Sequence, residues 1–182
     1  MARKAKSRPT ARSSGAAATP REMIIEAFMT LLADHPIEDI GLADIASEAG
    51  VTLSELRGEF GSPMAILAAH IKDIDRKVLD GGDADMDDES PRERLFDVLM
   101  RRLDPYKASV RSLMRSAARN PGLALTLNAH AVCSQQWMLT AAGIGASGPK
   151  GMIRAQGLAL MFANVLRTWV NDDDEGHAAA GS

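Results

Sequence analysis

Residues 42–60, LADIASEAGVTLSELRGEF, form the stretch of sequence that decides the fold. Its first half places apolar side chains at helical spacing, and Gly50 ends that helix. Thr52 and Glu55 then form a capping box, which begins a second short helix. Ala46 is small enough to let the two helices cross closely, and Val51 fills the wedge between them. Two short helices joined by a tight turn are a helix-turn-helix, whose second helix can lie in the major groove of DNA.

Similar start signals divide the rest of the chain into helices. Residues 19–22 (Thr-Pro-Arg-Glu) and 90–93 (Ser-Pro-Arg-Glu) each combine a capping residue, a first-turn proline and a glutamate. We expect helices over 20–34, 42–49, 53–59, 63–80, 91–103, 105–119, 123–142 and 149–170, with an acidic loop over 83–89. Apolar usage favours Ala, Leu and Met over Val, Ile and Thr, as is typical of helices. The sequence therefore predicts an all-α fold.

The charge of the chain is unevenly distributed. Residues 1–21 contain six basic residues and no acid, whereas the remainder has 15 basic residues (21 minus 6) against 24 acids. The six are Arg3, Lys4, Lys6, Arg8, Arg12 and Arg21. A basic arm on an acidic body indicates contact with a polyanion, and the alternative is a disordered, solubilising leader.

Composition also excludes several classes of protein. No apolar run approaches the roughly 20 residues that a membrane-spanning helix needs, so we expect no membrane insertion. The single cysteine, Cys133, excludes an internal disulfide framework and fits a reducing cytosol, so we expect a cytoplasmic protein. The four histidines are scattered, which argues against a metal site. Because no phosphate loop, nucleophile motif or carboxylate pair can be recognised, we expect no enzyme and no cofactor.

The helix-turn-helix segment resembles the TetR family of bacterial regulators over residues 20–71. The family pattern reads roughly Ile-Ala-x-x-Ala-Gly-Val-Ser, followed by a short recognition helix that ends in Phe. The matching residues are Ile45, Ala46, Ala49, Gly50, Val51, Thr52, Leu56, Phe60 and Ser62. The resemblance implies an N-terminal three-helix DNA-binding domain followed by a helical domain that dimerises and often holds a small apolar ligand. Arg57 stands where the family commonly has a phosphate-binding Tyr, and Pro63 where it commonly has a Lys.

These observations predict four segments and a set of DNA contacts. The segments are a disordered basic arm (1–18), the helix-turn-helix domain (19–71), a ligand-binding and dimerisation domain (72–171) and a flexible tail (172–182). The expected contacts with double-stranded DNA are Arg8, Arg12, Thr52, Leu53, Ser54, Glu55, Arg57 and Gly58. Residues 22–71 contain nine acids and one base, so we expect the arm to supply most of the DNA affinity. The predicted function is a transcriptional regulator, a repressor released by a small apolar ligand.

The body carries the candidate ligand and partner sites. Residues suited to an apolar ligand, or alternatively to an ordinary core or dimer interface, are Met100, Met114, Trp137 and Met138. Asn128 and Gln135 are the candidates for hydrogen bonds to that ligand. The last helix is apolar around much of its circumference, which predicts a homodimer. Residues 94–174 also resemble lipid-binding accessory proteins of ubiquinone biosynthesis, which share the TetR-like fold without binding DNA. This alternative rests on Pro105-Tyr106, Trp137 and Trp169.

Overall fold

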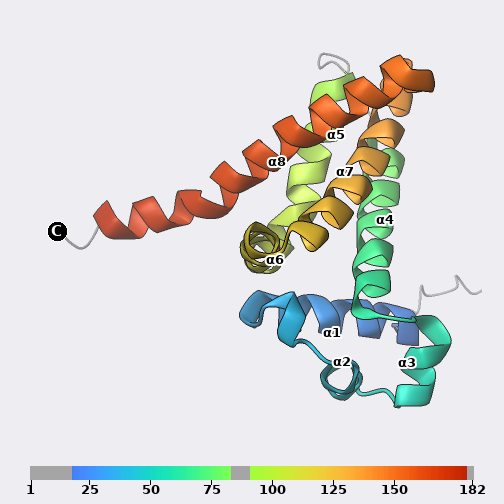
Figure 1. Ribbon diagram of the computed structural model, residues 1–182, viewed down its shortest axis with the longest axis vertical. Coiled ribbons are helices and arrows are strands. Elements are labelled where there is room, and N and C mark those ends of the chain that lie inside the picture. The colour runs from blue at the N-terminus through green and yellow to red at the C-terminus, as the bar shows by residue number, and fades with distance from the viewer. Residues whose placement is uncertain (1–17, 83–90, 180–182) are drawn as a thin grey trace, which may run out of the picture.

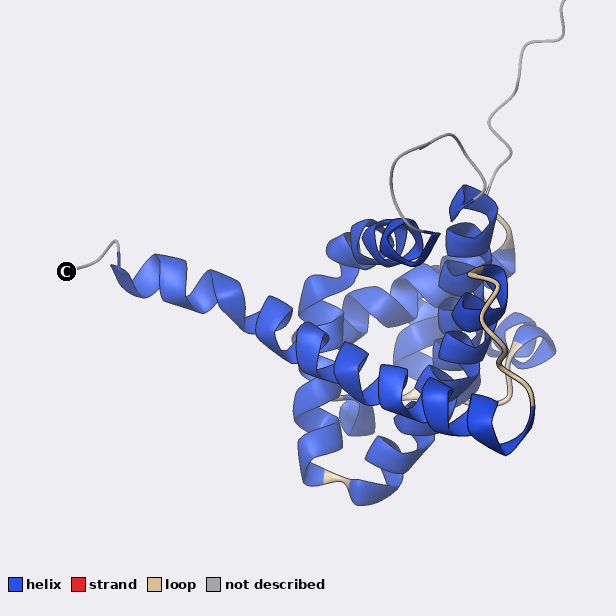
Figure 2. Ribbon diagram, turned by 90° about the horizontal axis from the view of Figure 1, so that it is seen from above, coloured by secondary structure: helices blue, strands red, loops and turns tan. Residues whose placement is uncertain are grey.

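The computed structural model describes the backbone of residues 18–82 and 91–179, with side chains over 18–80 and 95–172. Within these ranges every regular element is a helix (Figure 2), which confirms the predicted all-α fold. In chain order the elements are α1 (Pro20–Asp34), η1 (Ile37–Asp39), α2 (Leu42–Ala49), α3 (Leu53–Glu59), α4 (Pro63–Gly82), α5 (Pro91–Leu103), η2 (Asp104–Tyr106), α6 (Lys107–Arg119), α7 (Pro121–Ala141) and α8 (Gly148–Ala179).

The first three helices form a small head with its own core. Apolar side chains of α1 at helical spacing, among them Ile24, Phe28 and Leu32, are fully buried. Ile45 of α2 and Leu56 of α3 pack against them in the same cluster. The head therefore holds α2 and α3 in a fixed relation through the apolar face of α1.

The long helix α4 leads from the head into the body formed by α5 to α8 (Figure 1). The N-terminal half of α4 packs with the head core, and Ile74 and Val78 in its second half pack with Leu95 and Leu99 of α5. Helix α8 crosses the body, and its C-terminal end projects away from the other helices in both views. α4 is thus common to both cores.

Helix boundaries differ from the sequence prediction for α4, α6, α7 and α8. α4 continues to Gly82, a 3-10 turn precedes α6, α7 spans Pro121–Ala141, and α8 spans Gly148–Ala179. The start of α7 was missed because Asn120-Pro121 reads as a chain break. The Asn120 side chain instead accepts a hydrogen bond from the Leu123 N–H at 3.1 Å, and Pro121 occupies the first turn. The predicted acidic loop and basic arm lie outside the described residues.

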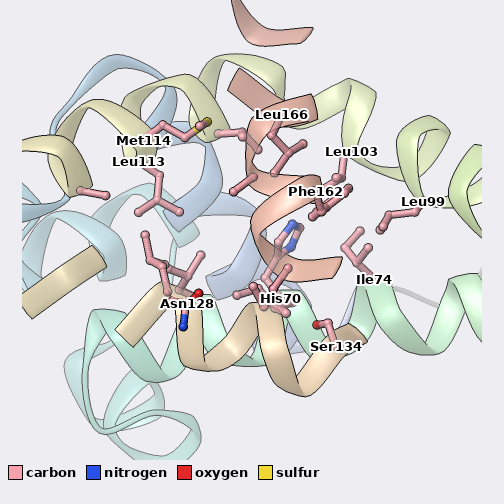
Figure 3. Close-up of a pocket in the computed structure, with 18 of the residues that line it drawn as sticks. His70, Ile74, Leu99, Leu103, Leu113, Met114, Asn128, Ser134, Phe162 and Leu166 are labelled. Atoms are coloured by element: carbon pink, nitrogen blue, oxygen red, sulfur yellow. The ribbon is translucent and has the colours of Figure 1, made fainter. Parts of the chain in front are cut away.

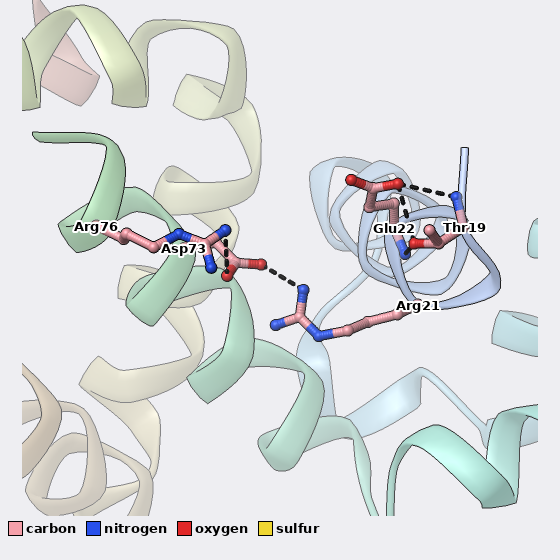
Figure 4. Close-up of polar contacts among 5 residues, drawn as sticks. All are labelled: Thr19, Arg21, Glu22, Asp73 and Arg76. Atoms are coloured by element: carbon pink, nitrogen blue, oxygen red, sulfur yellow. Dashed lines mark hydrogen bonds and ion pairs between the residues drawn. The ribbon is translucent and has the colours of Figure 1, made fainter. Parts of the chain in front are cut away.

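Hydroxyl groups and ion pairs join the head to the body, among them the pair between Arg119 of α6 and Glu38, at 3.7 Å. On α6, Ser109 donates to the Met29 carbonyl at 2.7 Å, and Ser112 donates to the His35 carbonyl at 2.9 Å. The second bond satisfies a carbonyl just beyond the end of α1, where no intrahelical partner exists. Arg21 of α1 reaches Asp73 of α4, with 2.7 Å between Nη1 and Oδ2 (Figure 4). These contacts fix α1 against both α4 and α6.

Candidate nucleic-acid interface and ligand cavity

The turn between α2 and α3 depends on one glycine. Gly50 adopts a left-handed conformation with φ 65° and ψ 30°, which L-residues other than glycine adopt only at a cost. The Val51 N–H then donates to the Ala46 carbonyl at 3.0 Å, which closes the end of α2. A Cβ atom at Gly50 would meet nothing within 4 Å, so the requirement for glycine is conformational rather than steric.

The capping box predicted at the start of α3 is present. The Glu55 carboxylate accepts from the Thr52 N–H and hydroxyl, both at 2.8 Å, and the Glu55 N–H donates to the Thr52 hydroxyl at 3.2 Å. The bond from the Thr52 N–H, followed by that from its hydroxyl, lowers the pKa of Glu55. Thr52 and Glu55 are exposed, yet their polar groups are already used to begin the helix. In this arrangement they fix the position of α3.

The remaining side chains of α3 divide into an inner and an outer face. Leu56, with Phe60 just after the helix, faces the core with 1% and 8% of its surface exposed. All six predicted contacts on this helix are exposed, namely Thr52, Leu53, Ser54, Glu55, Arg57 and Gly58. Leu53 is an apolar residue with 57% of its surface in solvent. It is the first residue of α3, and in helix-turn-helix proteins the N-terminal residues of the second helix contact base edges. Arg8 and Arg12 lie outside the described residues.

Arg21, counted with the basic arm in the sequence, belongs structurally to the head. Its guanidinium is paired with Asp73 and its side chain is only 35% exposed. The hydrogen bond to Asp73 raises its pKa, so the charge remains but is directed at α4. The other five basic residues of the arm lie outside the described residues, namely Arg3, Lys4, Lys6, Arg8 and Arg12.

The body contains an apolar cavity of about 450 Å³, some of whose lining residues are drawn in Figure 3. This volume falls in the range of about 300–1,000 Å³ that is usual for small-molecule sites. Its walls come from α4, α6, α7 and α8, with contributions from α1 and α5, and include Ile74, Leu99, Leu113 and Phe162.

Four of the six predicted ligand residues line this cavity, namely Met114, Asn128, Gln135 and Met138. Met100 and Trp137 do not. Gln135 and Met138 are three positions apart on α7 and share its inner face, whereas Trp137 is rotated about 100° from Met138. Its indole is consequently 58% exposed. Because α7 is apolar on most sides, the sequence did not distinguish its inner face from its outer one.

The polar groups of the cavity are few, and most have partners. The Asn128 and Gln156 amides exchange two hydrogen bonds of 3.0 Å, and Ser134 donates to the Asp75 carboxylate at 2.6 Å. Burial raises the pKa of Asp75, and the bond from Ser134 partly opposes that effect. Of the side chains described, over 18–80 and 95–172, no Lys or Arg contributes to the wall.

His70 is one of the cavity residues absent from the predicted ligand set. It lies on α4 with 6% of its surface exposed, and its ring meets that of Tyr106 edge to face at 4.5 Å between centroids. Its Nε2 atom is buried without a hydrogen-bond partner. Burial, helped by the nearby charge of Lys77 and opposed by Asp73, lowers the pKa of His70 to about 4. The sequence offered one signal for it, because His70 is a titratable residue among apolar residues at helical spacing, namely Ile66, Leu67, Ile71, Ile74 and Val78.

The described part of the chain also bears on metal binding and on membrane insertion. No group of three or more His, Cys, Asp or Glu side chains there is arranged to hold a metal ion. None of the helices described combines the length and the apolar character that crossing a membrane requires.

Comparisons with known proteins give likenesses among solved structures alone. No protein-family model matches the chain, and no curated protein matches it. Among solved structures, the chain is similar to a TetR transcriptional regulator from Rhodococcus sp. RHA1, at 22% identity and a TM-score of 0.48. The match covers 84% of each chain. The function is therefore inferred from the helix pair α2 and α3 and from the cavity in the body.

Proposed function

We propose that this protein is a DNA-binding transcriptional regulator that acts as a homodimer and responds to a small, largely apolar ligand. The observation that carries the proposal is the pair α2 and α3, joined at a left-handed Gly50, with α3 exposing the side chains that can reach DNA. A short helix held this way can enter the major groove while the rest of the head contacts the backbone. Leu53 and Ser54 are the residues proposed to meet base edges, and Arg57 to meet phosphate.

The second support for the proposal is the apolar surface of the last two helices. Leu125, Trp137, Met152, Ile153, Leu160, Met161 and Val165 are all large apolar residues with at least 37% of their surface exposed. Ile153, Leu160 and Met161 stand at i, i+7 and i+8, so they share one face of α8. A second copy of this chain, covering that face, would give the two-fold symmetry that a dimeric reader of DNA needs.

The experiment that tests DNA binding is selection of genomic fragments by the purified full-length protein at moderate salt. A regulator enriches fragments that share one sequence motif. Salt-sensitive binding without a motif would leave only nonspecific attraction by the arm, and would refute the proposal. The lipid-binding alternative expects no motif and binding of a quinone or fatty-acyl lipid.

The dimer has its own test, in light scattering at micromolar concentration. Ile153→Glu places a charge on the exposed face of α8 and should convert a dimer to a monomer with its helical content intact. Leu53→Glu is the matched control, because Leu53 is also exposed and apolar but lies on α3. A wild-type monomer, or dissociation by both variants alike, would contradict the proposed interface.

A further inference from the structure

The cavity in the body has walls that discriminate by charge. Among the residues whose side chains the structure describes, its lining combines many aliphatic and aromatic side chains with one carboxylate, Asp75, and without any Lys or Arg. A ligand carboxylate or phosphate placed there would lose its hydration and meet no cation in return. The lining therefore disfavours anionic ligands such as fatty acids.

Among the described residues of this wall, one polar atom is completely buried and has no partner within the protein; the Gln135 amide also has no hydrogen bond but is not completely buried. Nε2 of His70 is buried and unbonded, whereas Asn128 is paired with Gln156, and Asp75 accepts from Ser134. His70 lines the cavity, and Figure 3 places its ring among Ile74, Phe162 and the other apolar side chains. A buried polar atom that lacks a partner destabilises a protein, and such atoms are uncommon in native folds unless a bound molecule satisfies them.

We propose that the cavity binds an uncharged, largely apolar molecule carrying a hydroxyl or carbonyl group, and that this group forms a hydrogen bond with Nε2 of His70. The inference rests on the proposed function, because it names the class of ligand to which that regulator responds. A hydroxyl suits either neutral form of the imidazole, since it can donate to a bare nitrogen or accept from an N–H. The lowered pKa of His70 keeps its imidazole ring neutral at pH 7. His70 therefore supplies no positive charge that could balance an anionic ligand.

The test compares three ten-carbon probes, 1-decanol, decanoate and decyltrimethylammonium, by calorimetric titration and thermal shift of the full-length protein. We expect decanol to bind and decanoate to bind at least about 10-fold more weakly, because its charge is buried unpaired. His70→Phe keeps a ring against Tyr106 and removes both nitrogens. It should weaken decanol binding by about 2- to 12-fold, the value of one neutral hydrogen bond. His130→Phe, a histidine outside the cavity, is the matched control and should leave binding unchanged.

Each other outcome has a definite meaning. Equal binding of decanoate and decanol, or an unaltered decanol affinity in His70→Phe, would overturn the inference. Tighter binding of the cation that is lost in Asp75→Asn would replace His70 by Asp75 as the polar contact and would also overturn it. Failure of all three probes, in a protein that still selects a DNA motif, would reject this ligand class while leaving the DNA-binding function standing. Tight decanol binding by a protein that selects no motif would reject the regulator but support the assignment to His70.

Discussion

The buried imidazole of His70 makes a quantitative prediction about stability and pH. In the unfolded chain its pKa is close to 6.5, and in the folded protein it is about 4. The folded state therefore binds fewer protons than the unfolded state between these values, so the contribution is intact above pH 6.5 and is lost as the pH falls towards 4. The full difference corresponds to roughly 3 kcal/mol, of which about 2 kcal/mol is lost by pH 5.

The perturbation that isolates this effect is His70→Phe, measured by urea denaturation between pH 7.5 and pH 5. At pH 7.5 the variant should be more stable than the wild type by about 1–3 kcal/mol, because it removes an unpartnered buried atom and keeps the ring contact with Tyr106. On lowering the pH to 5, the wild type should lose about 2 kcal/mol more than the variant. Other groups titrate in both proteins and cancel in the difference. Parallel stability curves would refute the reasoning, and His130→Phe controls for loss of an imidazole elsewhere.

The remaining predictions concern the head. Gly50→Ala should destabilise the protein by about 1–2 kcal/mol in thermal or urea denaturation because of the positive φ, whereas Gly58→Ala, with open space around its Cβ, should stabilise it by up to about 1 kcal/mol. Thr52→Ala should cost about 0.5–2 kcal/mol through loss of the cap, and an unchanged midpoint would count against the hydrogen bonds described. Deletion of residues 1–18 should reduce the slope of log affinity for DNA against log salt by up to about 4–5 per arm, and Arg57→Ala by about one more. An unchanged slope and full specific affinity after the deletion would contradict the arm's role.

The sequence specified most of the fold because its helix starts carry local chemistry. The capping boxes at Thr19 and Thr52 form between residues three apart, so they can be recognised without knowledge of the rest of the molecule. Gly50 likewise indicated the end of α2, because glycine readily adopts the left-handed conformation needed there. The C-terminal end of α8 lacked such a signal: the chain beyond Val170 is acidic and then rich in Ala, and the helix continues through it to Ala179.

The candidate site was less predictable, because burial depends on partners distant in the sequence. Trp137 was expected at the cavity on its chemistry, but the angular position of α7 turns it outward. His70 stands among apolar residues in the sequence, yet its unpartnered Nε2 atom is apparent only once α6 and the other walls are in place. The predicted segment limits, the DNA contacts and the role of the cavity remain predictions for the experiments above.

The serines of α6 limit how the molecule can deform. Ser109 and Ser112 hold α1 at Met29 and at His35, and hydrogen bonds of this kind fail when stretched by a few tenths of an ångström beyond about 3.2 Å. Continuous sliding of α1 along α6 would break both bonds, so small displacements must carry the two helices together. Ser109 and Met29 both also lie in the wall of the cavity. A displacement of α1 relative to the body would therefore also move part of the cavity wall, and we expect a molecule bound in the cavity to restrict the orientation of the head.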